Sequence, residues 1–114
     1  TVAEQLPDSN PSKKAALDYV QKYDKVYGAG MRNQFAAHSY DTLLVLQKVV
    51  PMALQKAKPG TKEFRAALRD AMENFGPLPI SQGVMNFTKT DHWGYTKDSA
   101  VVLKVVNGDW EVQQ

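Results

Sequence analysis

The chain has 114 residues, of which 43% are hydrophobic and 23% are charged, so it falls in the ordinary globular class and can form one modest core. Its 14 basic and 12 acidic residues are interspersed and leave a formal charge of +2, so no basic stripe is available for a phosphate backbone and no nucleic-acid partner is expected. There is no cysteine, and the longest apolar run, LLVL, is far too short to span a bilayer. The sequence therefore predicts neither disulfides nor membrane insertion.

The first part of the chain predicts the end of a strand and then a helix. Residues 1–6 are typical of a strand end that Pro7 stops, and because the chain begins without methionine we expect that this strand is truncated. Asn10 followed by Pro11 predicts an N-cap with proline at the first helical position, and Gly28 is typical of a helix end. The apolar stripe of this helix comprises Ala16, Leu17, Val20, Tyr23 and Tyr27.

Two further helices are predicted in the middle of the chain. The second runs from about residue 36 to residue 58, and Pro51 inside it removes a hydrogen-bond donor, so we expect a kink between Gln47 and Pro51. Thr61 is the expected N-cap of the third helix, which Gly76 ends. The predicted buried face of the third helix comprises Phe64, Leu68, Ala71, Met72 and Phe75.

From Val84 onward the hydrophobic period changes to two, which is typical of strands. The five residues from Val84 predict a short strand, and residues 99–112 predict a hairpin around the Asn107-Gly108 turn. This turn predicts a register that pairs Val105 with Trp110, Leu103 with Val112 and Lys104 with Glu111. Taken alone, the chain is predicted to be α+β, with about three helices followed by a short strand and a C-terminal β-hairpin.

The second helix is predicted to lack a polar face around residues 43–46. These four successive apolar residues, LLVL, lie about 100° apart around the axis and point in every direction. Two amphipathic helices and one hairpin cannot cover such a helix on all sides. We therefore expect either that the sequence is a piece of a larger α/β protein or that the chain self-associates. The shortened strand at the start favours the first explanation.

Three successive pieces of the chain resemble the C-terminal part of the type I periplasmic solute-binding proteins of branched-chain amino-acid-type ABC transporters. The pieces are LPDSNPSKKAALDYVQKYDKVYG, then QFAAHSYDTLLVLQKVVPMALQKAKPGTKEFRAALRDAMEN, and then GVMNFTKTDHWGYTKDSAVVLKVVNGDWEV. The resemblance spans essentially the whole chain. No single piece is a sharp motif, and the specificity comes from their order.

The resemblance implies an α/β parent protein with two lobes, a hinge that the chain crosses three times, and a solute bound between the lobes. Residues 1–6 would be one hinge crossing and residues 82–87 the next. Residues 7–81 would belong to the helical part of the N-terminal lobe, and residues 88–114 would add a β-hairpin to the C-terminal lobe. The parent would be exported to the periplasm by a signal peptide that this sequence lacks, and an ABC permease would be its partner. A parallel sheet in the rest of the parent chain would cover the second helix.

The same resemblance implies that Phe35 faces the cleft between the lobes and packs on the solute. His38 and Tyr40 follow at spacings that could bring hydrogen-bond donors to that cleft, where a carboxylate or hydroxyl of the solute would sit. Each residue also has a purely structural alternative. Phe35 could be a core residue at the helix entrance, His38 a hydrogen-bonded residue inside the lobe, and Tyr40 a residue packed against the sheet.

The sequence predicts no enzyme and no cofactor. It contains neither a Gly-rich phosphate loop nor a nucleophile elbow. The two histidines, His38 and His92, lie far apart in the sequence, and Asp91 and His92 fall in a turn where we expect them to be solvated, so no metal site is predicted. Asn33, His38 and Asp41 could be drawn as a hydrolytic cluster, but such a set arises by chance in most chains of this length. Asp41 is expected to act as a favourable charge near the positive start of the second helix.

Two functional hypotheses follow. The first is a fragment of the solute-binding component of an ABC importer, which captures a small carboxylated compound by lobe closure. Aromatic or branched-chain acids and amino acids are favoured over sugars, because the cleft residue is Phe35 and the loop before it is not rich in amides. The second is a self-associating α+β interaction module or a sensor module.

Overall fold

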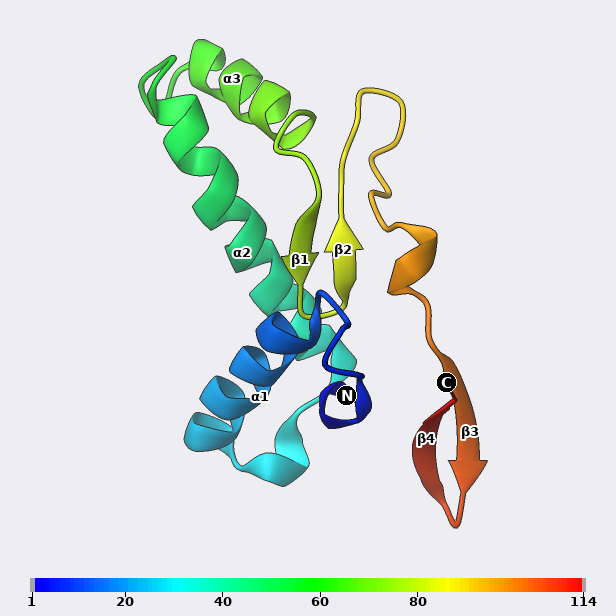
Figure 1. Ribbon diagram of the computed structural model, residues 1–114. Helices are drawn as coiled ribbons and strands as arrows, with labels where there is room; N and C mark the ends of the chain where they lie inside the picture. The colour runs from blue at the N-terminus through cyan, green and yellow to red at the C-terminus, as the bar shows by residue number, and fades with distance from the viewer. Residues whose placement is uncertain (1, 114) are drawn as a thin grey trace.

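The computed structural model describes residues 2–113, and they form the α+β structure that the sequence predicts. The structure is elongated and measures 53 × 32 × 20 Å. Helices and two small antiparallel strand pairs follow one another along the chain (Figure 1). The helices are α1 (Lys13–Tyr27), α2 (Gln34–Leu54) and α3 (Lys62–Met72), and the short 3-10 helices are Ala3–Gln5, Ala29–Met31 and Lys97–Ser99. The strands are β1 (Leu78–Ile80), β2 (Gly83–Met85), β3 (Val102–Val106) and β4 (Asp109–Gln113).

Helix α1 begins later than the sequence predicts, and the predicted strand end before it is a 3-10 helix at Ala3–Gln5. The Asn10 side chain does not cap the helix, because its Oδ1 accepts the backbone N–H of Ser12 at 2.9 Å in a turn that precedes it. The helix then starts at Lys13, with Ser12 in the N-cap position. It ends at Gly28 as predicted, where the Gly28 N–H donates to the Asp24 carbonyl at 2.9 Å.

Helix α2 begins two residues before its predicted start and ends before its predicted end. Asn33 caps it, because its Oδ1 accepts the Ala36 N–H at 3.0 Å. The helix continues through Pro51 and ends at Leu54. Pro51 is exposed and lies in the last turn, so the missing donor leaves only one late helical hydrogen bond unmade.

Helix α3 begins as predicted, since the Thr61 Oγ1 accepts the Phe64 N–H at 3.1 Å. It packs against α2, and this contact builds one of two apolar cores. The core that joins α2, α3, β1 and β2 contains Val45, Val49, Ala71, Phe75, Ile80 and Met85. The core that joins the N-terminal segment, α1 and the start of α2 contains Ala3, Leu6, Ala16, Tyr19, Val20 and Ala37.

The two strand pairs lie apart from each other (Figure 1). Strand β1 was not predicted, and it pairs with β2 so that Ile80 lies opposite Gly83. Strands β3 and β4 form the predicted hairpin with the predicted register, in which Val105 pairs with Trp110. Asn107 and Gly108 have φ of 53° and 85°, the positive values that a two-residue hairpin turn of this hand requires.

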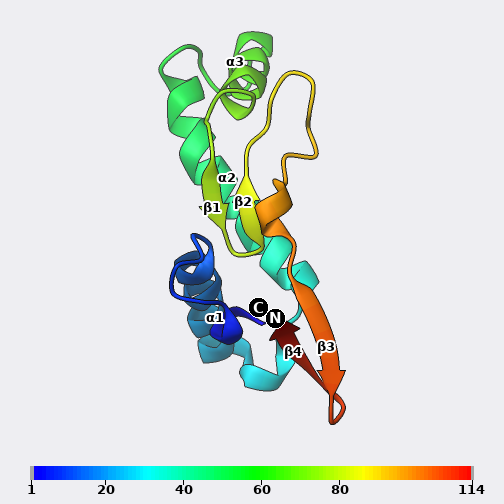
Figure 2. The same ribbon diagram turned by 45° about the vertical axis from the view of Figure 1, so that its right-hand side comes forward.

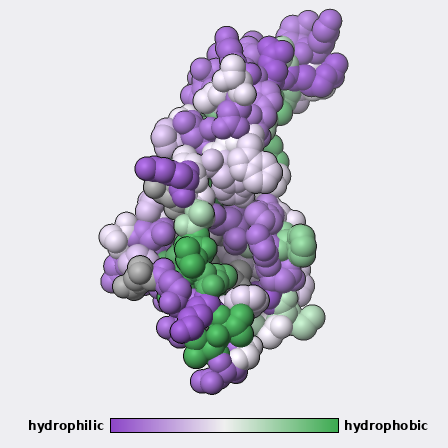
Figure 3. Space-filling model, turned by 90° about the vertical axis from the view of Figure 1, so that its right-hand side faces the viewer, coloured by the Kyte–Doolittle hydropathy of each residue, from purple (hydrophilic) through white to green (hydrophobic). Residues whose placement is uncertain are grey.

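Apolar side chains remain exposed on two parts of the structure. On α2, Leu43, Leu46 and Leu54 face solvent, while Val45 and Val49 are buried, so the helix is covered on one side within residues 2–113. The hairpin stands away from α3 in two views (Figures 1 and 2). Seen from the side of the hairpin, apolar residues gather in the lower half of the molecule and polar residues border them (Figure 3). The exposed apolar residues of the hairpin and the segment before it are Val101, Val102, Leu103, Val105 and Trp110.

Candidate functional site

A hollow of about 840 Å³ lies between the N-terminal segment, the start of α2, the segment after β2 and the hairpin. We call it the main hollow. It is within the size range of small-molecule sites. Among the described residues that line it, Lys97 carries a positive charge and none is an Asp or a Glu. Lys97 thus offers one cationic group to a solute in the main hollow. The lining residues used below are Gln34, His38, Trp93, Tyr95, Lys97 and Trp110.

His38 lines the main hollow, and it is held from both sides of its ring. Its Nδ1 lies 3.2 Å from the Tyr95 hydroxyl oxygen, and its Nε2 lies 3.3 Å from the Gln34 side-chain nitrogen. An amide nitrogen only donates, so the Gln34 contact favours the tautomer in which Nε2 accepts and Nδ1 carries the proton. In that tautomer His38 donates to Tyr95 across 57 positions of sequence, and the two rings meet edge to face at 6.5 Å.

Asp41 lies on the same side of α2 and holds the turn between β1 and β2. It is buried, and its Oδ1 accepts the backbone N–H of Ser81 at 2.6 Å. Burial raises the pKa of this carboxyl, and the hydrogen bonds from Ser81 oppose that rise. The expectation that Asp41 sits near the positive start of the helix is wrong. Because α2 begins at Gln34, Asp41 lies two turns further along and acts through Ser81.

Asp41 and His38 also line a second, smaller hollow of about 230 Å³. Its other walls are residues of α2, mostly apolar, with Met85 of β2, Phe87 and Tyr95. The Asp41 Oδ2 is buried and has no hydrogen-bond partner among the described residues. Tyr95 therefore stands between two hollows, and burial raises the pKa of its hydroxyl, with the Asp41 carboxylate adding to the rise.

Phe35 is 82% exposed and lines neither hollow. Its neighbour in sequence, Gln34, lines the main hollow, but successive side chains on a helix point about 100° apart, so Phe35 on the first turn of α2 does not face it. Within residues 2–113, Phe35 is not a core residue at the helix entrance. A phenylalanine left this exposed presents an apolar surface that a solute or a partner can cover.

Tyr40 points toward α1 and lines neither hollow. Its hydroxyl donates to the Asp18 carboxylate, and the Lys22 ammonium donates to the same hydroxyl at 3.2 Å. Its ring packs on Tyr19 with the centroids 5.7 Å apart. Burial, followed by the hydrogen bond to Asp18, raises the pKa of the Tyr40 hydroxyl. Of the three predicted site residues, only His38 lines a hollow. Tyr40 packs against helix α1, whereas the structural alternative in the sequence analysis had it packed against a sheet.

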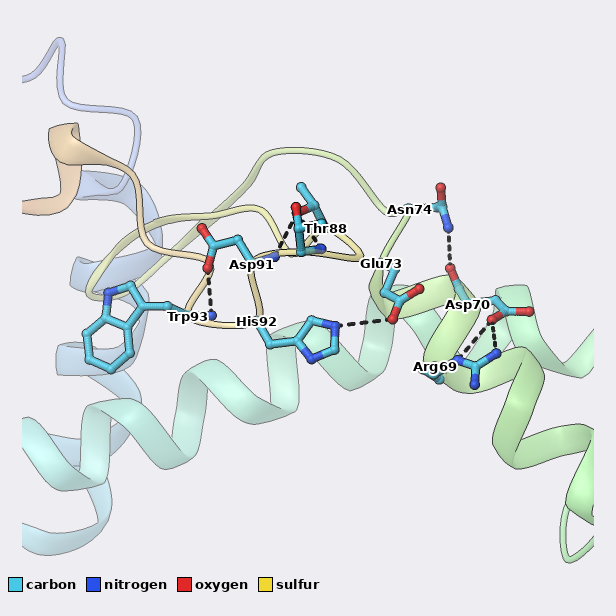
Figure 4. A network of polar contacts seen from close by, with 9 residues as sticks. Arg69, Asp70, Glu73, Asn74, Thr88, Asp91, His92 and Trp93 are labelled. Carbon is cyan, nitrogen blue, oxygen red and sulfur yellow. Dashed lines mark hydrogen bonds and ion pairs between the residues drawn. The ribbon is translucent and has the colours of Figure 1, made fainter.

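The turn after β2 carries the second histidine. His92 is exposed, and its Nε2 lies 3.1 Å from the Glu73 carboxylate at the end of α3 (Figure 4). Asp91 accepts backbone N–H groups of its own turn, so its carboxylate is engaged in local structure. In the part of the chain that the structure describes, no three His, Cys, Asp or Glu residues come together as metal ligands.

Sequence reasoning did not single out Trp93, Tyr95 or Gln34 as site residues. All three line the main hollow, and Trp93 is 76% exposed. The sequence offered one indication of Trp93. It lies between Asp91 and Gly94 in a polar turn, where a tryptophan is expected to be exposed and available for binding. Nothing in the sequence placed that turn beside α2.

No protein-family model and no curated protein matches the chain. Among solved structures, an extracellular ligand-binding receptor from Rhodopseudomonas palustris matches with 46% identity and a TM-score of 0.89. Two from Rhodopseudomonas palustris HaA2 match with 42% and 33% identity and TM-scores of 0.90 and 0.84. The matches cover 97–98% of this chain but 31% of each receptor chain, so the chain spans about a third of their length.

These neighbours are ligand-binding receptors and not enzymes, in agreement with the prediction for this chain. Within the described residues, no helix is both long and apolar enough to cross a membrane.

Proposed function

We propose that the chain is the C-terminal portion of a periplasmic solute-binding protein, which captures a small carboxylated organic compound between two lobes and delivers it to an ABC permease. The observation that carries the proposal is the match of nearly the whole chain to one third of extracellular ligand-binding receptors, at TM-scores of 0.84 to 0.90. The remaining two thirds of such a parent chain would supply the sheets of both lobes. No reaction is performed, and capture proceeds by lobe closure.

The main hollow supports this assignment, because it lies between two parts of the chain. Helix α2 lines one side of it and the C-terminal hairpin lines another. Gln34 and His38 come from α2, whereas Trp110 comes from β4. In the proposed division, residues 7–81 belong to the N-terminal lobe, residues 82–87 cross the hinge, and the hairpin belongs to the C-terminal lobe. The main hollow is then part of the cleft that closes on the solute.

The solute class follows from the charges and surfaces around the main hollow. Lys97 in the lining favours an anion, hence a carboxylated compound over a sugar. The exposed ring of Phe35 on the first turn of α2 favours an aromatic or branched-chain acid or amino acid. Lobe closure would bring Phe35 onto the solute.

The test is a thermal-shift screen of the full-length protein against aromatic acids, aliphatic amino acids and sugars, repeated with Phe35→Ala. One acid class should raise the melting temperature by several degrees, and Phe35→Ala should reduce that shift. Tyr27→Ala is the matched control, because Tyr27 is also an exposed aromatic residue, 62% accessible, and it lines neither hollow. A protein that responds to no solute of any class would refute the proposal.

The alternative is a self-associating module or sensor, favoured by the leucines exposed on α2. Sedimentation of the 114-residue chain at several concentrations separates the two accounts in part. A concentration-independent monomer with a cooperative thermal transition would argue against a fragment. A weakly folded or self-associating species would agree with a fragment whose apolar surface other parts of the parent cover.

A further inference from the structure

One short segment presents two side chains to the main hollow, the indole ring of Trp93 and the hydroxyl-bearing ring of Tyr95. Both line it, and their ring centroids lie 5.8 Å apart with the planes tilted by 59°. The indole of Trp93 and the imidazole of His92 leave their turn in opposite directions, so that Trp93 points away from α3 and its Glu73 (Figure 4). An exposed tryptophan offers large contact area at a low cost in side-chain entropy.

The turn that carries Trp93 is fixed by its own hydrogen bonds. The Asp91 Oδ1 accepts the Trp93 N–H at 2.9 Å and the Gly94 N–H at 3.3 Å, while the Thr88 Oγ1 accepts the Asp91 N–H at 3.0 Å. Gly94 is buried against Phe87. The backbone below Trp93 is therefore ordered before any solute arrives, and binding need not fix it.

The Tyr95 hydroxyl is left with an unused proton. In the tautomer that the Gln34 contact favours, His38 donates to the Tyr95 oxygen and the hydroxyl proton of Tyr95 is not used by His38. In the part of the chain that the structure describes, this hydroxyl has no other hydrogen-bond partner. Burial raises its pKa, so it stays protonated at neutral pH and can donate to an acceptor in the main hollow.

We propose that Tyr95 donates a hydrogen bond to the carboxylate of the solute while Trp93 packs against a planar ring of the same solute, so that this pair selects ring-bearing carboxylic acids. The inference rests on the proposed function and names the residues that choose its substrate class. His38 is a positioning residue, because it reaches the solute only through the Tyr95 hydroxyl. Lys97, in the same lining, adds attraction for the anion.

The test uses isothermal titration of the full-length protein with two acids of similar size, benzoate and cyclohexanecarboxylate. Benzoate is planar and cyclohexanecarboxylate is not, so we expect benzoate to bind about 3- to 10-fold more tightly, the range for aromatic pairs. Trp93→Ala should weaken benzoate more than cyclohexanecarboxylate and remove this preference. Tyr95→Phe should weaken both acids by about 10- to 100-fold, the range for a hydrogen bond to a charged group.

His38 is tested by rescue. His38→Leu removes the donor to Tyr95 and should weaken both acids, whereas His38→Asn places an amide N–H near the position of Nδ1 and should restore most of the affinity. A purely structural role would not distinguish these variants in affinity at equal thermal stability. Tyr27→Phe is the control, because this exposed hydroxyl lies on α1 and lines neither hollow.

The ligand side of the test needs no variant. Methyl benzoate keeps the ring but lacks the carboxylate, and it should bind at least about 10-fold more weakly than benzoate. If benzoate binds but Tyr95→Phe and Trp93→Ala leave both affinities unchanged, this inference is overturned and the solute-binding function stands. The same holds if only aliphatic amino acids bind. If only sugars bind, the carboxylated solute class of the proposed function fails as well. If the wild type binds no solute at all, both the inference and the proposed function fail.

Discussion

The carboxylate of Asp41 accepts the backbone N–H of Ser81 at 2.6 Å, across 40 positions of sequence. This contact ties the middle of α2 to the turn that joins β1 to β2. The Ser81 hydroxyl adds a longer contact of 3.5 Å to the Ala37 carbonyl. If residues 82–87 cross the hinge as proposed, Asp41 would fix the N-terminal lobe side of that crossing through Ser81.

Removing the Asp41 carboxylate should destabilise the full-length protein. Asp41→Ala leaves the Ser81 N–H without its acceptor in a buried site, and we expect a loss of about 1 to 3 kcal/mol in the free energy of unfolding. Asp41→Asn retains an oxygen that can accept the same N–H, so its loss should be smaller. Urea denaturation of the three proteins measures the difference. Equal stability of wild type and Asp41→Ala would show that Ser81 does not depend on this contact.

The pH dependence of stability follows from the raised pKa of Asp41. A folded-state pKa above the unfolded value of about 3.9 means that the folded protein binds more protons between the two values, so stability falls as pH rises through this window. This contribution is fully present below the unfolded pKa and is lost above the folded pKa. The stability of wild type relative to Asp41→Asn should therefore decrease from about pH 4 toward neutral pH. A series of urea denaturations across this range measures it, and a relative stability that increases with pH would contradict the prediction.

The elements that the sequence predicted well are those with strong local signals. Thr61 caps α3, Gly28 ends α1, and the Asn107-Gly108 turn sets the hairpin register, because each depends on residues within one turn. Strand β1 was missed because Pro79 lies at its centre and proline is typical of strand interruption. A two-stranded pair has only edges, where an unpaired proline nitrogen is tolerated.

The site was predicted less completely, because its contacts join distant parts of the chain. The periodicity of α2 cannot show that Tyr40 turns to Asp18 on α1 while His38 turns to Tyr95. Nor can residue type decide whether Phe35 is buried, since phenylalanine is common in cores. The role of Trp93 depended on where its turn lies in space, which is a property of the fold.

Gly94 should tolerate no side chain, because its φ is positive and Phe87 occupies the space that a Cβ would need. Its φ is 74°, and a Cβ added there would lie 2.3 Å from the Phe87 ring. Gly94→Ala should therefore cost the backbone strain of about 1 to 2 kcal/mol plus the cost of moving Phe87, and should displace Trp93. Gly76→Ala is the control, because its φ is 76° and nothing lies within 4 Å of an added Cβ.

Thermal denaturation and benzoate titration of both glycine variants of the full-length protein give the comparison. Gly94→Ala should be less stable than Gly76→Ala and bind benzoate more weakly, while Gly76→Ala should lose stability but keep wild-type affinity. Equal losses of stability in the two variants would mean that Phe87 moves aside freely. Unchanged benzoate affinity in Gly94→Ala would mean that the turn does not position Trp93.

The side chain of Gln5 occupies the outer edge of β4, and its removal should expose that edge. Its Oε1 accepts the Val112 N–H at 2.8 Å and its Nε2 donates to the Trp110 carbonyl at 2.9 Å, so one amide pairs as a further strand would. In Gln5→Ala the Val112 amide should exchange with solvent about 2- to 10-fold faster, the range for one exposed hydrogen bond. Gln5→Glu keeps the acceptor for Val112 and should preserve its protection.

Amide exchange of the full-length protein by NMR measures this, with the Ala37 amide inside α2 as the internal reference. Unchanged exchange at Val112 in Gln5→Ala would show that other groups protect the edge of β4.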